Sequence, residues 1–244
     1  MVAAGAGGPL QRTRGDATVA QETQPGTRPA GELGAPPGRF GLLLLVLIIT
    51  YLLSAFAKGH WIDALQVVLF TVVAILALRN SSVSRRIVRV ILAAAIAVSA
   101  VMFALAFTVD TARGIVHVWT GVVLLGAVVV IVRRVLSFGE VTIQSIYGAL
   151  SAYLVIGLMF AAFYAAINLL VPGNFFANNQ PATTQTFQYF SFTTLTTLGY
   201  GDFTAIGNGG RAVAILEALT GQIFLATLVA RLVAAYRGPA DRQR

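Results

Sequence analysis

The sequence predicts an all-α membrane protein in which six helices cross the bilayer and a shorter segment re-enters it between the fifth and sixth helices. Of the 244 residues, 57% are hydrophobic and only 11% are charged, whereas soluble domains usually carry about a quarter charged residues. Six apolar segments have roughly the 20 residues that cross the hydrocarbon core. They cover residues 40–57, 61–79, 87–109, 114–132, 144–170 and 211–236. The first, second and fourth are near the short end of the allowed range.

The residues before the first segment, 1–38, are rich in Gly, Pro, Ala and Thr and have no apolar period. This composition predicts a disordered tail. At the end of the first segment, Ala55-Phe56-Ala57 resembles a signal-peptide cleavage site, although the preceding region is much longer than a normal n-region. Cleavage there would leave five helices and would not change the rest of the topology.

The basic residues set the orientation of the helices, because connections rich in Lys and Arg stay in the cytoplasm. Of the 17 basic residues, all but Lys58, Arg113 and Arg211 lie in the two tails, in the connections after the second and fourth helices, or toward the adjoining helix ends. Both termini are therefore predicted to be cytoplasmic, with the chain in the plasma (cell inner) membrane. The net charge of +8 then reflects topology, and we expect no binding to nucleic acid.

The composition also excludes several classes of chemistry. The chain has no cysteine, which excludes disulfides and thiolate metal sites, and only two histidines, His60 and His117. No serine, histidine and carboxylate form a recognisable hydrolytic motif. We therefore expect neither an enzymatic activity nor a cofactor.

The connection between the last two helices, about residues 171–210, is predicted to lie outside the cell. Its first part is polar and contains the helix breakers Pro172, Gly173 and Pro181. The following segment, about 186–197, has the length and aromatic content of a short helix but is too short and too rich in threonine to span. We expect a re-entrant half-helix and an extended loop, since such backbone persists at membrane depth only where it is buried in protein or lines an aqueous path.

Residues 196–202, Thr-Thr-Leu-Gly-Tyr-Gly-Asp, resemble the selectivity-filter signature of potassium channels, with Leu198 in place of the usual valine. The resemblance extends over residues 141–236, and the last helix is similar to the inner helix of bacterial one-pore-loop channels. It implies a pore helix and a selectivity filter between helices 5 and 6, and passive conduction of K⁺. One chain supplies one wall of such a pore, so a homotetramer in the lipid bilayer is implied as well.

Composition, the apolar segments and the resemblance together divide the chain into four parts. Residues 1–38 are a disordered cytoplasmic tail, and residues 39–136 are a four-helix membrane domain without voltage-sensor charges. Residues 137–236 are the pore domain, and residues 237–244 are a short cytoplasmic tail.

The resemblance implies four residues that bind K⁺ through carbonyl oxygens and one hydroxyl: Thr197, Leu198, Gly199 and Tyr200. Such oxygens replace the water shell of the ion. Directing successive carbonyls at one axis requires alternating backbone conformations, some with φ above zero, which Gly199 and Gly201 adopt without steric penalty. The ring of Tyr200 is expected to pack against pore-helix aromatic residues such as Tyr189 and Phe190.

Four residues are expected to support the filter or form its outer mouth: Thr193, Thr196, Gly201 and Asp202. Asp202 would raise the local concentration of cations, and the alternative is a solvated loop acid. In many relatives a pore-helix glutamate braces this aspartate, but Thr193 stands at the matching position here. Gly-Tyr-Gly-Asp could also be an ordinary turn in an extracellular loop, which would leave the threonine run unexplained.

In the last helix, the resemblance places Gln222, Leu225 and Val229 toward the central cavity. Gly221 matches a hinge glycine of inner helices, and a small residue for close helix packing is an equal alternative. Glu217 lies off the cavity-facing stripe. We expect it to pack behind the filter, hydrogen-bonded to a pore-helix threonine; the alternative is direct attraction of cations.

The function implied is a potassium-selective channel without steep voltage gating. Steep gating needs several charges that move within the membrane field, but the fourth segment has no arginine at every third position, and Arg133 and Arg134 at its inner end already lie outside the core. Two other functions stay open. A weakly selective cation channel is possible because of Leu198, and a membrane scaffold or transporter would make the pore loop vestigial.

Overall fold

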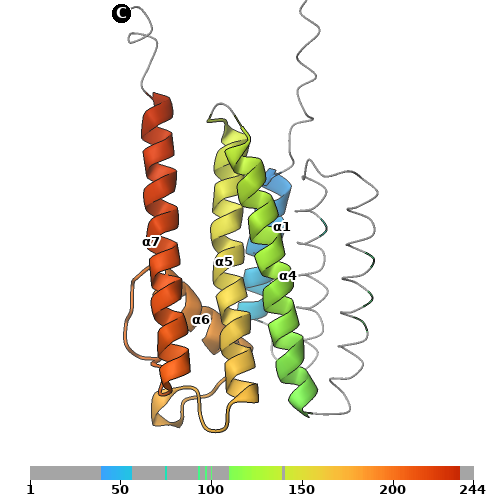
Figure 1. Cartoon of the computed structure of the whole chain (residues 1–244), viewed down its shortest axis with the longest axis vertical. Coiled ribbons are helices and arrows are strands. Elements are labelled where there is room, and N and C mark those ends of the chain that lie inside the picture. The colour runs from blue at the N-terminus through green and yellow to red at the C-terminus, as the bar shows by residue number, and fades with distance from the viewer. Residues whose placement is uncertain are drawn as a thin grey trace, which may run out of the picture. The chain divides into compact units, whose positions relative to one another are not determined.

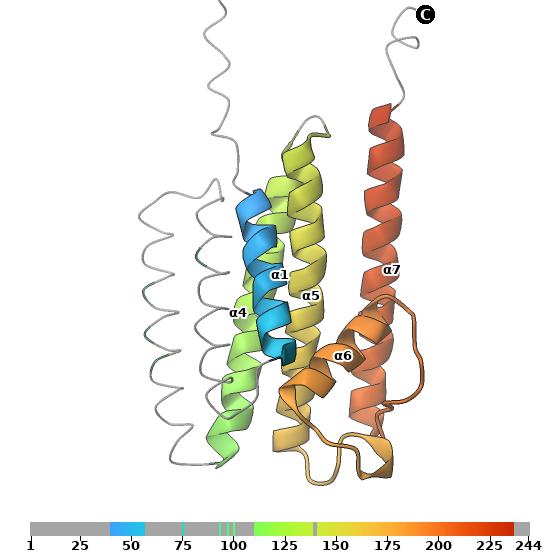
Figure 2. The ribbon, with the colours of Figure 1, turned by 180° about the vertical axis from the view of Figure 1, so that it is seen from behind.

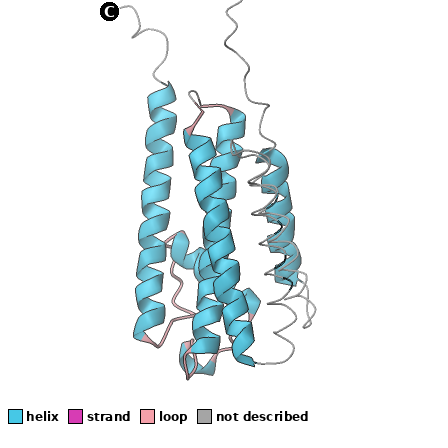
Figure 3. Ribbon diagram, turned by 45° about the vertical axis from the view of Figure 1, so that its right-hand side comes forward, coloured by secondary structure: helices cyan, strands magenta, loops and turns pink. Residues whose placement is uncertain are grey.

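The computed structural model describes residues 40–56, 75, 93, 97, 100, 110–138 and 141–236. All of them belong to one unit, residues 37–244. Within these residues the fold is built from helices joined by loops (Figure 3). The helices are α1 (Phe40–Phe56), α4 (Asp110–Leu136), α5 (Ile143–Leu170), the short 3₁₀ helix η1 (Ala177–Asn179), α6 (Thr184–Leu195) and α7 (Asn208–Tyr236).

Three of these helices are long and apolar enough to cross a membrane, namely Arg113–Leu136, Ile143–Leu170 and Asn208–Ala234, and α1 is a shorter apolar helix. The predicted segments 40–57, 144–170 and 211–236 correspond closely to α1, α5 and α7. The predicted segment 114–132 is longer in the structure, because α4 continues through Arg133 and Arg134 to Leu136. The predicted helices 61–79 and 87–109 and both tails lie outside the described residues.

Helix α5 is the centre of the described fold and packs against α4, α1, α6 and α7 (Figure 1). Of its most apolar stretch 72% is buried, against 28% for α4 and 11% for α7. Glycines allow the close approach of α4 and α5. A Cβ on Gly121 would come within 2.5 Å of the Phe163 ring, and one on Gly148 within 2.6 Å of Val135.

Local chemistry fixes the ends of α5 and α6. Each helix begins with a capping box, in which the N-cap hydroxyl and the third residue exchange hydrogen bonds: Thr142 with Ser145, and Thr183 with Thr186. Helix α5 ends at Leu170, just before Val171-Pro172, because the residue before a proline avoids the helical region. The short helix predicted at about 186–197 begins and ends two residues earlier in the structure, because Thr183 caps its start and the positive φ of Thr197 does not fit a helix.

An aromatic cluster and one antiparallel bridge connect the segments before and after α6. Phe176 pairs with Ala205, and the bridge includes bonds from Ala177 N to Thr204 O (2.9 Å) and from Ile206 N to Phe175 O (3.0 Å). The rings of Phe175 and Phe176 pack on Phe187 with centroids 5.3 and 5.2 Å apart. Sequence reasoning did not foresee this bridge. It holds both ends of the loop that carries the candidate site.

Candidate functional site

The segment singled out by the sequence follows α6 directly and leads back to the start of α7. Figure 2 shows α6 as a short inclined helix next to α5 and α7, followed by an extended stretch of chain. Helix α6 packs on α5, α7 and α1, and its buried face comprises Phe187, Gln188, Phe190, Ser191 and Leu195. This packing determines where the chain emerges at Thr196.

The sign of the φ angle alternates along this segment. The φ angle is +57° at Thr197, +51° at Gly199 and +80° at Gly201, while Leu198 and Tyr200 between them do not have positive φ. Glycine accepts positive φ readily, but a β-branched threonine there is a conformational outlier. Such outliers persist only where the surroundings hold them and they gather at functional sites. The alternation expected for a row of carbonyl ligands is therefore present at these positions.

Hydrogen bonds hold the first residues of this segment against the end of α6. The amides of Leu198 and Gly199 both donate to the carbonyl of Thr193, at 2.8 and 3.1 Å, and the amide of Thr197 donates to Thr194 O at 2.9 Å. With these donors directed back at the helix, the amides of the three residues are satisfied within the chain.

The Thr197 hydroxyl links the segment to α7. It donates to Thr196 O at 2.7 Å and accepts from Gln222 Nε2 at 3.1 Å. The hydroxyls of Thr193 and Thr196 instead donate to carbonyls within α6. Of the three threonines, Thr197 is thus the one whose hydroxyl contacts the helix expected to line the cavity.

Asp202 is braced by two residues that the sequence did not indicate as its partners. The Tyr189 hydroxyl donates to Asp202 Oδ2 at 2.8 Å, and Gln180 Nε2 donates to Asp202 O at 2.6 Å. This bond to Asp202, aided by desolvation and by the Asp202 charge, raises the pKa of Tyr189. The hydroxyl therefore stays protonated, and keeps donating, to a higher pH than that of a free tyrosine. In the sequence, the signal that could have indicated this contact is the one tyrosine among the phenylalanines of α6.

The expected packing of Tyr200 on Tyr189 and Phe190 is not found within one chain. The Tyr200 ring is 67% exposed. Among the described residues, the ring of Tyr189 packs on Phe203, and that of Phe190 packs on Tyr164, Phe175 and Phe176. The core inside the chain takes up these aromatic residues, and Tyr200 is left on the surface together with Leu198, which is 54% exposed.

Glu217 is completely buried between α5, α6 and α7. Its carboxyl group is hydrogen-bonded to Ser191 of α6 and accepts a bond of 2.6 Å from the Tyr164 hydroxyl of α5. The prediction that Glu217 bonds to a threonine of the short helix is wrong, because Ser191 is the hydroxyl residue on the buried face of α6. Tyr164 was not foreseen.

The remaining residues predicted on α7 fall into two groups. Gly221 packs against the end of α6, where an added Cβ would overlap Leu195 O and lie 3.0 Å from Leu195 Cδ1. Gln222, Leu225 and Val229 are exposed in the single chain. Their exposure leaves them available to a cavity or to another subunit.

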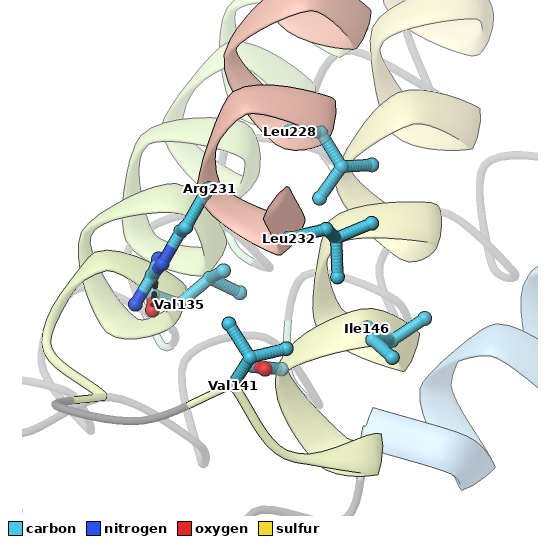
Figure 4. A pocket seen from close by; sticks show the side chains of 7 residues that line it. Val135, Val141, Ile146, Leu228, Arg231 and Leu232 are labelled. Atoms are coloured by element: carbon cyan, nitrogen blue, oxygen red, sulfur yellow. Dashed lines mark hydrogen bonds between the residues drawn. The ribbon is translucent and has the colours of Figure 1, made fainter. Parts of the chain in front are cut away.

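The C-terminal part of α7 is hydrogen-bonded to the end of α4. Arg231 Nη1 donates to Val135 O at 2.7 Å and Nη2 donates to Phe138 O at 2.6 Å. Figure 4 shows the Arg231 side chain reaching from α7 to Val135, beside a small pocket that Leu228, Leu232, Val141 and Ile146 also line. A cation at the C-terminal end of a helix is stabilised by the free carbonyls there.

Helix α1 contacts α6 directly, which the sequence did not indicate. The hydroxyl of Ser54, a buried residue, donates to Gln188 Oε1 at 3.1 Å, and Gln185 Nε2 donates to Ser54 O at 3.1 Å. The rings of Tyr51 and Phe192 meet edge to face with centroids 5.1 Å apart. The first helix therefore supports the short helix in addition to α5 and α7.

Comparison with protein families gives one match to this region. Residues 153–237 match the family described as "Ion channel". The match begins inside α5 and includes α6, the segment with alternating φ, and α7, and it supports an ion-channel domain in a membrane. Comparison with curated proteins and with solved structures gave no match.

Proposed function

We propose that the chain is one subunit of a homotetrameric, potassium-selective channel that conducts K⁺ passively across the plasma membrane. The observation that carries this proposal is the alternation of φ at Thr197, Gly199 and Gly201. Such a backbone can present successive carbonyl oxygens to an ion that has lost its water. The proposed ligands are the carbonyls of Thr197 to Tyr200 and the Thr197 hydroxyl, with Asp202 at the outer mouth.

The proposed topology has six transmembrane helices, a re-entrant pore helix α6 and both termini in the cytoplasm. Residues 39–136 form a four-helix membrane domain and residues 137–236 the pore domain, with tails at 1–38 and 237–244. The filter residues follow the C-terminal end of α6, whose negative dipole end favours a cation. Gln222, Leu225 and Val229 are assigned to the cavity below it.

Assembly into a tetramer is supported by what a single chain leaves uncovered. The candidate filter residues Leu198 and Tyr200 are exposed, and so are apolar side chains of α7 such as Ile215, Ile223 and Val233, at 62%, 66% and 57%. Lipid can cover apolar helix surface, but a filter segment at membrane depth must be buried in protein or line a water-filled path. Neighbouring copies around one axis meet that need.

Rubidium uptake into proteoliposomes tests the proposal. We expect uptake that exceeds sodium uptake, that barium blocks, and that comes from a protein of tetramer mass in mild detergent; empty liposomes are the control. Equal uptake of sodium would favour the weakly selective channel. No uptake by well-folded protein would favour the scaffold or transporter, and a selectively conducting monomer or dimer would contradict the assembly.

Voltage should have little effect on opening. An elementary charge that crosses the membrane field contributes about 2.3 kcal/mol per 100 mV, but the described part of α4 carries arginines only near its ends, Arg113, Arg133 and Arg134. Charges at the ends of a helix move through little of the field. Currents in planar bilayers with symmetric potassium measure this, and an open probability rising e-fold within a few millivolts would contradict it.

Replacing Tyr189 by phenylalanine should shorten the time that the channel stays conducting and leave its ion selectivity unchanged. The substitution removes the hydroxyl that braces Asp202 and keeps the ring that packs on Phe203. Single-channel recordings would measure the open bursts. Tyr147→Phe, near the inner end of α5, is the matched control and should behave as the wild type. Unchanged bursts in Tyr189→Phe would remove the role assigned to this hydrogen bond.

A further inference from the structure

Three buried side chains from three helices meet behind the candidate filter. Glu217 of α7, Ser191 of α6 and Tyr164 of α5 are each fully buried. The Tyr164 hydroxyl donates to Glu217 Oε2 at 2.6 Å, and Ser191 Oγ is hydrogen-bonded to Glu217 Oε1. Ser191 Oγ also donates to the Gly157 carbonyl of α5 at 2.6 Å. The group therefore connects α5, α6 and α7, the three α-helices described in the proposed pore domain.

A count of protons shows which state of Glu217 fits these contacts. The Ser191 hydroxyl has one proton and two close oxygen neighbours. The Gly157 carbonyl carries no proton, so the bond between it and Ser191 uses the proton of the serine. The contact between Ser191 Oγ and Glu217 Oε1 then needs a second proton, which a carboxylic acid supplies and a carboxylate does not.

The surroundings of Glu217 agree with a neutral side chain. Within the described ranges its carboxyl group contacts hydroxyl groups and forms no ion pair with an arginine or lysine. On the same helix, Arg211 donates instead to Ala205 O at 2.9 Å. An ionised carboxylate that is buried without a partner of opposite charge is strongly unfavourable, whereas a neutral acid with every hydrogen bond made is not.

We propose that Glu217 is a neutral carboxylic acid that positions the pore helix, donating to Ser191 and accepting from Tyr164. The hydrogen bonds then run in one direction: Glu217 donates to Ser191, and Ser191 donates to the Gly157 carbonyl. The positioning role rests on the proposed channel function, because Ser191 lies in the helix that delivers the chain to Thr197. A neutral Glu217 adds no negative charge to the pore, which argues against its attracting cations directly.

Infrared difference spectra test the protonation state directly. The wild-type protein in lipid at neutral pH, minus Glu217→Gln, should show the carbonyl stretch of a protonated carboxylic acid that shifts in D₂O. Tyr164→Phe removes the donor to the carbonyl oxygen and should move this band to higher frequency. A carboxylate band in its place would overturn the neutral assignment, and this readout does not depend on conduction.

Rescue by the isosteric amide tests the positioning role. Glu217→Gln should keep the thermal stability of the oligomer and the rubidium uptake, because its amide donates to Ser191 and its carbonyl accepts from Tyr164. Glu217→Ala leaves the buried hydroxyls of Tyr164 and Ser191 without their hydrogen-bond partner at residue 217, and it should reduce uptake by about tenfold or more. If glutamine proved as damaging as alanine, the positioning role would be overturned. Absence of uptake in the wild type would count against the channel itself and leave the infrared result intact.

Discussion

Replacement of Gly199 by alanine is expected to abolish potassium selectivity or conduction and to leave the protein inserted in the membrane. The φ angle of Gly199 is +51°, and no heavy atom among the described residues lies within 4 Å of an added Cβ. Within one chain the penalty is therefore conformational and not steric. A left-handed conformation costs an L-residue about 1–2 kcal/mol, and the proposed tetramer would carry the substitution in four adjacent walls of one filter.

A second glycine provides the matched control for this substitution. Gly207 lies after the filter segment, has no positive φ, and also has open space around an added Cβ. Gly207→Ala should therefore conduct as the wild type, although it adds the same methyl group to the same loop. Rubidium uptake with sodium as the competitor measures both variants. Wild-type selectivity in Gly199→Ala would falsify the assignment of the filter.

The parts of the fold that the sequence predicted well are those set by local chemistry. Long apolar runs placed α5 and α7, and Pro172 placed the end of α5, because each of these signals acts over a few neighbouring residues. The glycines at 199 and 201 predicted positive φ for the same reason. Positive φ at Thr197 had no such signal, since threonine does not favour that conformation.

Contacts between distant residues were beyond a sequence argument. Tyr189 with Asp202, Ser54 with Gln188 and Arg231 with Val135 each depend on how helices turn and approach. A sequence states which side chains can bond, but not which face of a helix meets which neighbour. For the same reason, the sequence led to the expectation that Tyr200 would pack on Phe190, whereas Phe190 is buried in the core of its own chain.

The partner of Glu217 shows that part of this information was available. Phe187, Ser191 and Leu195 recur every four residues and so lie on one face of α6, and all three are buried. Thr193 lies off that face. Applying helical spacing to the short helix would have placed Ser191, and not Thr193, on the face of the apolar residues Phe187 and Leu195.

Gly221→Ala is expected to destabilise the assembled protein and to reduce conduction strongly. The added Cβ would overlap the main-chain oxygen of Leu195 at the end of α6. That oxygen also accepts a bond of 3.2 Å from the Tyr153 hydroxyl, so α6 and α7 must separate where α5 also holds the chain. Overpacking of this kind typically costs about 1–3 kcal/mol per site. Thermal melting of the detergent-solubilised oligomer measures the effect, and Gly209→Ala, in the first turn of α7 with open space around its Cβ, is the control.

Two further results would separate packing from a hinge at Gly221. If the glycine served only to let α7 bend, Gly221→Ala would change the open probability and leave the melting temperature at the wild-type value. Packing predicts a lower melting temperature. It also predicts that Leu195→Ala does not rescue Gly221→Ala, because the atom in the way belongs to the main chain and remains when the Leu195 side chain is removed. Recovery of stability in the double variant would show that the side chain, and not the backbone of α6, sets the distance between the two helices.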